Sequence, residues 1–147
     1  MTRRQSDQLA QDVVGFIHAF GVLRSDTTPC GQPMSVSTAH ALCELATGPA
    51  LSQRDLATRV GLTTSTVSRL VDQLVEKGWA ERRVDPDSTD ARIRLVALTP
   101  DGDHVAGQVL TARAQRFARL LDAVPPDKQS TVVEALHLLK AATDALD

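Results

Sequence analysis

The sequence predicts a mainly α-helical protein with one small β-ribbon, and three observations support this class. Two short helical segments, separated by a tight turn, lie between residues 52 and 77. Two strand-like stretches, 79–84 and 93–98, then flank a polar turn. Long segments at both ends carry apolar residues at spacings of three and four, the repeat of an amphipathic helix. The 147 residues are enough for one domain with a real core.

The first short helix has a well-marked beginning and end. Ser52 is a residue type that caps free amide groups, and Asp55 completes the pattern of a capping box. Leu51 and Leu56 have the spacing of a hydrophobic staple around that cap. Gly61 can adopt the left-handed conformation that ends a helix. We therefore expect a helix that ends at about residue 60.

The second short helix is predicted from a cap at Thr63 to about Lys77, before Gly78 ends it. Apolar residues at positions i, i+3, i+4 and i+7 predict a stripe that faces a core, formed by Val67, Leu70, Val71 and Leu74. The opposite face carries Asp72 and a set of hydroxyl and guanidinium side chains, Thr64, Ser65, Thr66, Ser68 and Arg69. Such side chains contact base edges and phosphates when a helix lies in a DNA groove. Taken alone, the same polar face would also fit an ordinary solvated helix.

The two strand-like stretches predict a two-stranded ribbon. In the second stretch Ile93, Leu95 and Ala97 alternate with Arg92, Arg94 and Val96, which is the period of a half-buried ribbon. The residues between the stretches, Asp-Pro-Asp-Ser-Thr-Asp-Ala, are typical of a polar turn.

Helix, turn, helix and basic ribbon together predict a winged helix-turn-helix that binds double-stranded DNA. Arginine suits both phosphate contacts and a narrow minor groove. The candidates are the ribbon residues Arg82, Arg83, Arg92 and Arg94, together with Arg54 in the first short helix. A protein-contact module of the same shape is the rival interpretation, but such a wing would expose large apolar groups instead.

The segment from Leu51 to Gly102 resembles the DNA-binding core of the MarR family of winged-helix transcriptional regulators. Its most specific part is the wing, where an Asp-x-Arg pair, Asp90 and Arg92, precedes a strand that ends in Leu98-Thr99. The resemblance implies that Arg92 enters the minor groove and that Asp90 orients it or holds the wing turn. It also implies that the major-groove contacts are made by Ser65, Thr66, Ser68 and Arg69.

The resemblance extends to the flanks, so we interpret residues 1–147 as a single MarR-like domain. Residues 35–99 form its DNA-binding lobe, and residues 1–34 and 100–147 supply dimerisation helices and a loop. One helix is expected over residues 6–24, a second from Thr99-Pro100 to about Val124, and a third after Pro125-Pro126. Their apolar stripes exceed what the compact centre can cover. By resemblance they pack against a second subunit, which predicts a homodimeric repressor with recognition helices about 34 Å apart on an inverted-repeat operator.

The signal that releases such a repressor is left open between three candidates. In the family, small molecules bind between the dimer helices and the DNA-binding lobe, and the matching residues here are Phe16, Phe20, Cys30, His40, Glu44 and His104. A small-molecule effector must bind the two states of the dimer unequally to shift them. Zinc is the second candidate, because Cys30, His40 and His104 have suitable donors on elements expected to converge, similar in placement to the zinc-sensing branch of the family.

A thiol switch at Cys30 or Cys43 is the third candidate. Cys43 stands beside apolar residues and is interpreted as a small buried hydrophobe. No lysine or arginine lies near Cys30 in the sequence to favour a reactive thiolate. No cofactor is required by any of these interpretations.

Other function classes lack their signals. The chain has no glycine-rich phosphate loop, no G-x-S-x-G and no H-E-x-x-H, so we expect no enzymatic activity.

Residues 52–94 contain eight Lys and Arg against seven Asp and Glu, a local net charge of +1, although the whole chain has −2. Folding must therefore concentrate the basic groups. The residues after Arg3-Arg4 are not apolar, which predicts no targeting or membrane segment. The two cysteines form no C-x-x-C and fit a cytoplasmic location.

Overall fold

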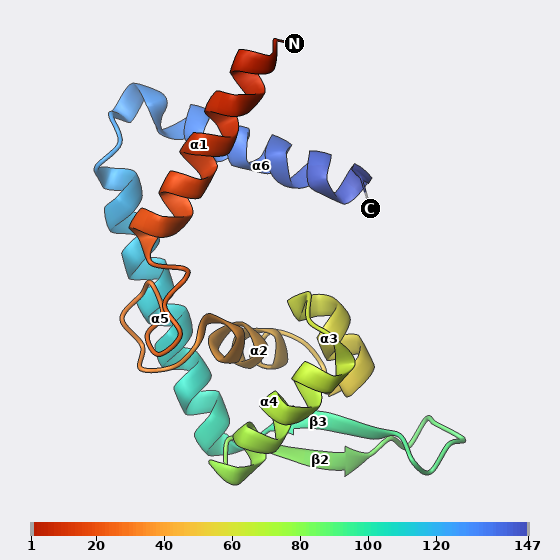
Figure 1. The fold of residues 1–147 in the computed structure, drawn as a ribbon. Helices are drawn as coiled ribbons and strands as arrows, with labels where there is room; N and C mark the ends of the chain where they lie inside the picture. The colour runs from red at the N-terminus through yellow and green to blue at the C-terminus, as the bar shows by residue number, and fades with distance from the viewer. Residues whose placement is uncertain (1, 147) are drawn as a thin grey trace. The chain divides into compact units, whose positions relative to one another are not determined.

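The fold is known from a computed structural model, which describes residues 2–146 (Figure 1). It is mainly helical, as predicted, with a small antiparallel sheet. The helices are α1 (Arg3–Phe20), α2 (Val36–Ala46), α3 (Gln53–Val60), α4 (Thr64–Glu76), α5 (Pro100–Asp122) and α6 (Gln129–Leu146), with a 3-10 turn, η1, at Pro126–Lys128. The strands are β1 (Leu51–Ser52), β2 (Ala80–Val84) and β3 (Arg94–Leu98). Contacts divide the chain into two compact units, which meet at residues 112 and 113 within α5.

The sheet has three strands, in the order β1-β3-β2, where the sequence predicted two. The extra strand is the residue pair Leu51–Ser52, which is antiparallel to β3, with Leu51 opposite Val96. It was missed because two residues carry no alternation. The β2–β3 ribbon extends beyond the helices of its unit, and the loop that joins its strands, residues 85–93, is the wing loop (Figure 1).

The sequence predicted the alternation in the second ribbon strand but not which set of its side chains faces the core. Residues directly opposite each other in an antiparallel pair share a face, and the register places Arg82 opposite Val96 and Ala80 opposite Leu98. Val96 is completely buried and Leu98 is buried, whereas Ile93 is 40% exposed. The core therefore lies on the face of Val96 and not on that of Ile93. A pattern of period two fixes the alternation but not which set faces the core, and the unpredicted pairing with Leu51 decides it here.

The core of the DNA-binding lobe brings together α2, α3, α4 and the sheet. Its largest fully buried side chains are Leu42, Leu56, Val67, Val71, Leu74 and Val96. The predicted α4 stripe is confirmed, because its four apolar residues are all buried. Burial of each such side chain contributes roughly 1.5–3 kcal/mol to the stability of the folded state. This packing holds the opposite face of α4 toward solvent.

The helix boundaries around the turn follow the predicted signals. The Ser52 hydroxyl accepts the N–H of Asp55 at 3.1 Å, and the Thr63 hydroxyl accepts the N–H of Thr66 at 3.2 Å. Gly61 ends α3 in the left-handed region, with a φ of 70°. These local signals therefore set the angle at which α4 leaves the turn.

A close joint connects the start of α5 to the beginning of the ribbon. The Thr99 hydroxyl accepts the N–H of Gly102 at 3.1 Å and donates to the Gly78 carbonyl at 2.5 Å. The Thr99 N–H donates to the Trp79 carbonyl at 3.0 Å. A Cβ atom at Gly102 would lie 2.8 Å from the Trp79 carbonyl carbon and closer still to its oxygen. Only glycine lets the first turn of α5 approach the ribbon so closely.

The flanking helices expose apolar side chains. α1 spans Arg3–Phe20, where the sequence predicted 6–24. It ends before residue 24 because Gly21 adopts a φ of 89°. No described residue of α1 or α6 is buried. Exposed apolar residues include Leu9, Val13 and Phe16 in α1, and Val132, Val133 and Leu136 in α6. Across residues 2–146, every helix is too short or too polar to cross a lipid bilayer.

Candidate DNA-binding interface

The exposed face of α4 presents hydroxyl groups at its start and a guanidinium one turn later. Thr64, Ser65, Thr66 and Arg69 are exposed, and Ser68 is half-buried. The Thr63 hydroxyl also donates to that of Thr66 at 2.8 Å, which fixes the first turn. The predicted contact residues therefore lie where a helix that enters a groove would reach base edges.

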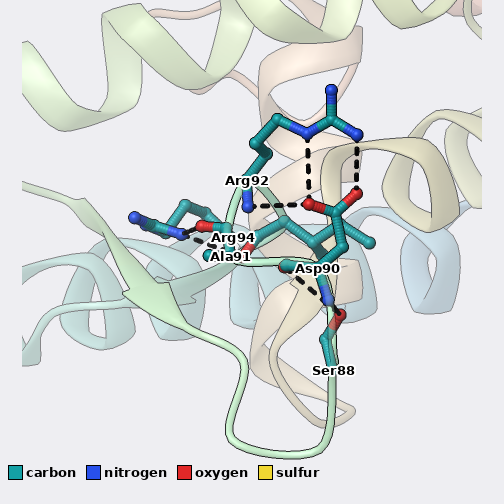
Figure 2. A network of polar contacts seen from close by, with 6 residues as sticks. Ser88, Asp90, Ala91, Arg92 and Arg94 are labelled. Atoms are coloured by element: carbon teal, nitrogen blue, oxygen red, sulfur yellow. Dashed lines mark hydrogen bonds and ion pairs between the residues drawn. The ribbon is translucent and has the colours of Figure 1, made fainter.

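The wing is organised by the pair Asp90 and Arg92, as Figure 2 shows. The Arg92 guanidinium donates through Nε to Asp90 Oδ1 at 3.1 Å and through Nη2 to Oδ2 at 3.2 Å. The Arg92 N–H donates to the same Oδ1 at 3.0 Å. The guanidinium first, and the backbone N–H second, lower the pKa of Asp90 below its ordinary 3.8. One carboxylate thus orients Arg92 and also closes the wing turn.

The Arg92 side chain nevertheless stays 91% exposed. The Ser88 hydroxyl accepts the Asp90 N–H at 3.1 Å, which holds the carboxylate from the other side of the turn. Arg94 folds back along the wing, where its Nη1 donates to the Ala91 carbonyl and, at 3.2 Å, to the Ile93 carbonyl. The wing arginines are therefore oriented before any ligand binds.

Four arginines from three parts of the lobe line one open groove of roughly 460 Å³. Arg54 comes from α3, Arg82 from β2, and Arg92 and Arg94 from the wing loop and β3, with Ser52, Gln53 and Ile93 between them. Arg83 is the ribbon arginine that does not line this groove. It is opposite Leu95, on the other face of the sheet, and its Nε donates to Glu81 at 2.6 Å.

Arg82 is held by two helices. Its Nη2 donates to Asp72 Oδ1 of α4 at 2.5 Å and to Gln53 Oε1 of α3 at 3.2 Å. Sequence reasoning placed Asp72 on the solvated face of its helix and did not single out Gln53. Neither partner has a local sequence signal, because they lie 10 and 29 residues from Arg82.

The predicted effector residues lie on α1, α2, α5 and the loop between α1 and α2. The rings of Phe16 and Phe20 stack with their centroids 5.4 Å apart. His40 lies 3.4 Å from Glu44, whose second oxygen is 3.7 Å from the Arg59 guanidinium. Glu44 therefore joins α2 to α3 through an ion pair.

The expected convergence of Cys30, His40 and His104 is not observed. Among residues 2–146 no three His, Cys, Asp or Glu side chains are placed to hold a metal ion. His104 instead lies beside Gln108 of its own helix, with 3.4 Å between their Nε2 atoms. Cys30 is a half-buried free thiol, and Cys43 is a buried one.

Comparisons with known proteins agree with this geometry. The model of the MarR family matches residues 32–93. Mb2034c of Mycobacterium bovis is 30% identical over 146 residues, which cover 95% of this chain and 97% of that protein. The HTH-type transcriptional regulator YdgG of Bacillus subtilis is 27% identical over 90 residues, 61% of this chain. That match spans 59% of the YdgG length.

Solved structures share the fold at low sequence identity. FabT of Streptococcus pneumoniae, solved in complex with DNA, has a TM-score of 0.71 and 17% identity, and the match covers 99% of each chain. PcaV of Streptomyces coelicolor, solved in complex with its natural ligand, has a TM-score of 0.68 and 24% identity. That match covers 95% of this chain and 92% of PcaV.

Proposed function

We propose that this chain, which belongs to the MarR family of transcriptional regulators, is a sequence-specific DNA-binding repressor that acts as a homodimer on an inverted-repeat operator. Family and fold are those of transcriptional regulators, which are not enzymes. The observation that carries the proposal is the arginine-lined groove, which is linked to α4 through the bond between Arg82 and Asp72.

Each part of the interface has a distinct task in this proposal. The hydroxyl groups and Arg69 of α4 read base edges in the major groove. Arg92 enters the adjacent minor groove, where a planar guanidinium suits the narrow, negative channel. Arg54 and Arg94 contact the phosphates that flank it, which fixes position rather than sequence. FabT, a protein of the same fold, has been solved with DNA.

Dimerisation is supported by the apolar surface of the flanking helices. Val133 and Leu136 of α6 are 56% and 55% exposed, and Phe16 of α1 is 44% exposed. On each helix, exposed apolar side chains of this kind mark an interface. We expect sedimentation equilibrium to give twice the chain mass, and Leu136→Glu to shift it toward the monomer. A monomeric wild-type protein would contradict the proposal.

Release by a small-molecule effector completes the proposal. PcaV has the same fold and has been solved with its natural ligand. In this chain Phe16, Phe20, Cys30, His40, Glu44 and His104 remain the candidate binding residues. We place an organic effector before zinc, because among the described residues 2–146 the three metal donors are not gathered. A ligand acts only if it binds the DNA-competent and DNA-incompetent dimers unequally.

Fluorescence anisotropy over a salt series tests the central claim. We would first select duplexes from a randomised pool with the wild-type protein, and then compare the selected duplex with an unrelated one. Arg92→Ala should weaken binding to the selected duplex by at least about tenfold, while the dimer stays intact. Arg83→Ala, on the other face of the ribbon, is the matched control and should cost less.

Two results would contradict the proposal. Unchanged affinity in Arg92→Ala would remove the wing from the mechanism. Failure to enrich any duplex would favour a winged helix that contacts protein instead of DNA.

A further inference from the structure

We infer that Asp72 is a specificity-determining residue, which withholds Arg82 from the DNA backbone and fixes the wing against the recognition helix. The inference rests on the proposed DNA-binding function. The four groove arginines differ in which residues restrain their side chains.

Arg82 is restrained by groups from outside the wing. Asp72 belongs to α4 and Gln53 to α3, and both accept from the same nitrogen, Nη2, at 2.5 and 3.2 Å. Within residues 2–146, in contrast, the side chains of Arg92 and Arg94 bond only to residues 90, 91 and 93 of the wing. Across residues 2–146 no hydrogen bond or ion pair is found for the Arg54 side chain. Arg82 is therefore the arginine that connects the ribbon to both helices of the helix-turn-helix.

Stability alone does not account for this ion pair. The Arg82 side chain is 33% exposed and that of Asp72 is 65% exposed. Exposed ion pairs contribute little to stability because water and salt screen them. The pair has two other effects: it sets the position of β2 relative to α4, and it neutralises a guanidinium in the groove.

Both effects favour selective over sequence-independent binding. An arginine free to neutralise a phosphate strengthens binding to every duplex and steepens its salt dependence, with a slope of about −0.9 per phosphate. An arginine held by Asp72 adds less to that general attraction. It also keeps the wing in one position relative to α4, so that base contacts and minor-groove contacts are made together.

The test compares Asp72→Asn with the wild-type homodimer on a selected and an unrelated duplex, by anisotropy over a salt series. The variant keeps the shape of the side chain and removes its charge. We expect the log–log salt slope on unrelated DNA to steepen by about 1.8, one phosphate for each subunit. Affinity for unrelated DNA should rise about threefold or more at low salt, and the ratio of selected to unrelated affinity should fall by at least that factor.

Three further variants separate this mechanism from general electrostatics. Glu76→Gln removes a negative charge from the same helix, one turn away from Asp72, and no ion pair to Glu76 is found within residues 2–146. It should leave the salt slope unchanged. Asp72→Asn/Arg82→Gln should return the slope to its wild-type value. Asp72→Ala, which removes the acceptor altogether, should steepen the slope at least as much as Asp72→Asn.

The outcomes decide the inference. Equal slopes in wild type and Asp72→Asn, or an equal change in Glu76→Gln, would overturn it. The inference would also be overturned if Asp72→Asn lowered the affinity for both duplexes equally and lowered the melting temperature. That result would mean that Asp72 only stabilises the fold. Absence of selective binding by the wild-type protein would instead refute the proposed function.

Discussion

Gly102→Ala offers the sharpest test of the joint between the ribbon and α5. The added Cβ would lie 2.8 Å from the Trp79 carbonyl carbon, a distance that real Cβ atoms essentially never show. The obstructing atoms are backbone, so α5 or the ribbon must move. Overpacking of this kind costs about 3 kcal/mol, while alanine in a helix recovers about 1 kcal/mol relative to glycine. The net loss is about 2 kcal/mol, or a melting temperature lower by roughly 4–8 °C.

Gly107→Ala in the same helix is the matched control. Its Cβ would meet nothing within 4 Å, so only the helix propensity changes. The free energy of unfolding should therefore increase by about 1 kcal/mol, and the melting temperature should rise by a few degrees. Differential scanning calorimetry on the two variants and the wild type measures both shifts. If Gly102→Ala melts at or above the wild-type temperature, the close approach of α5 to Trp79 is not present in solution, and the reasoning fails.

Three further predictions concern the lobe. Arg69→Ala should change the base preference of the selected duplex by roughly 1–3 kcal/mol, measured by repeating the selection; a uniform loss over all sequences would make Arg69 a phosphate contact. Because Arg92 lowers the pKa of Asp90 below 3.8, the wing bridge should be complete above that pH and break only as the pH falls through the lowered pKa. A carboxyl NMR titration with a midpoint at or above 3.8 would contradict the bridge. Thr99→Val should cost about 1 kcal/mol in thermal melts through the lost cap on Gly102, whereas Thr99→Ser should keep most of the stability.

The parts of the fold that the sequence predicted well depend on neighbours within one or two helical turns. The caps at Ser52 and Thr63 are made by amides three residues away, and Gly61 needs only its own backbone freedom. The buried stripe of α4 follows from helical periodicity. Such signals lie within a short window, so a single sequence contains them.

The parts that were missed depend on residues far apart in the chain. β1 exists because Leu51 pairs with Val96, 45 positions away (96 − 51). That pairing decides which face of β3 meets the core, so the alternation was predicted and its direction was not. The restraint of Arg82 by Asp72 and Gln53 has the same character. The Asp90–Arg92 bridge was anticipated because its two members are separated by one residue and match a family motif.

The ion pairs in the groove determine how many arginines are free to neutralise phosphates, in a chain whose net charge is −2. Of the four groove arginines, Arg82 and Arg92 have carboxylate partners and Arg94 bonds to carbonyl groups, which leave its charge uncompensated. If only Arg54 and Arg94 neutralise phosphates, the groove of a dimer contributes about four contacts and a salt slope of roughly −4. If DNA opens the bridges of Arg82 and Arg92, the dimer makes about eight phosphate contacts and the salt slope becomes roughly −7. A slope near the smaller value means that the bridges persist on DNA, and that shape and base contacts, rather than bulk charge, must provide most of the selectivity.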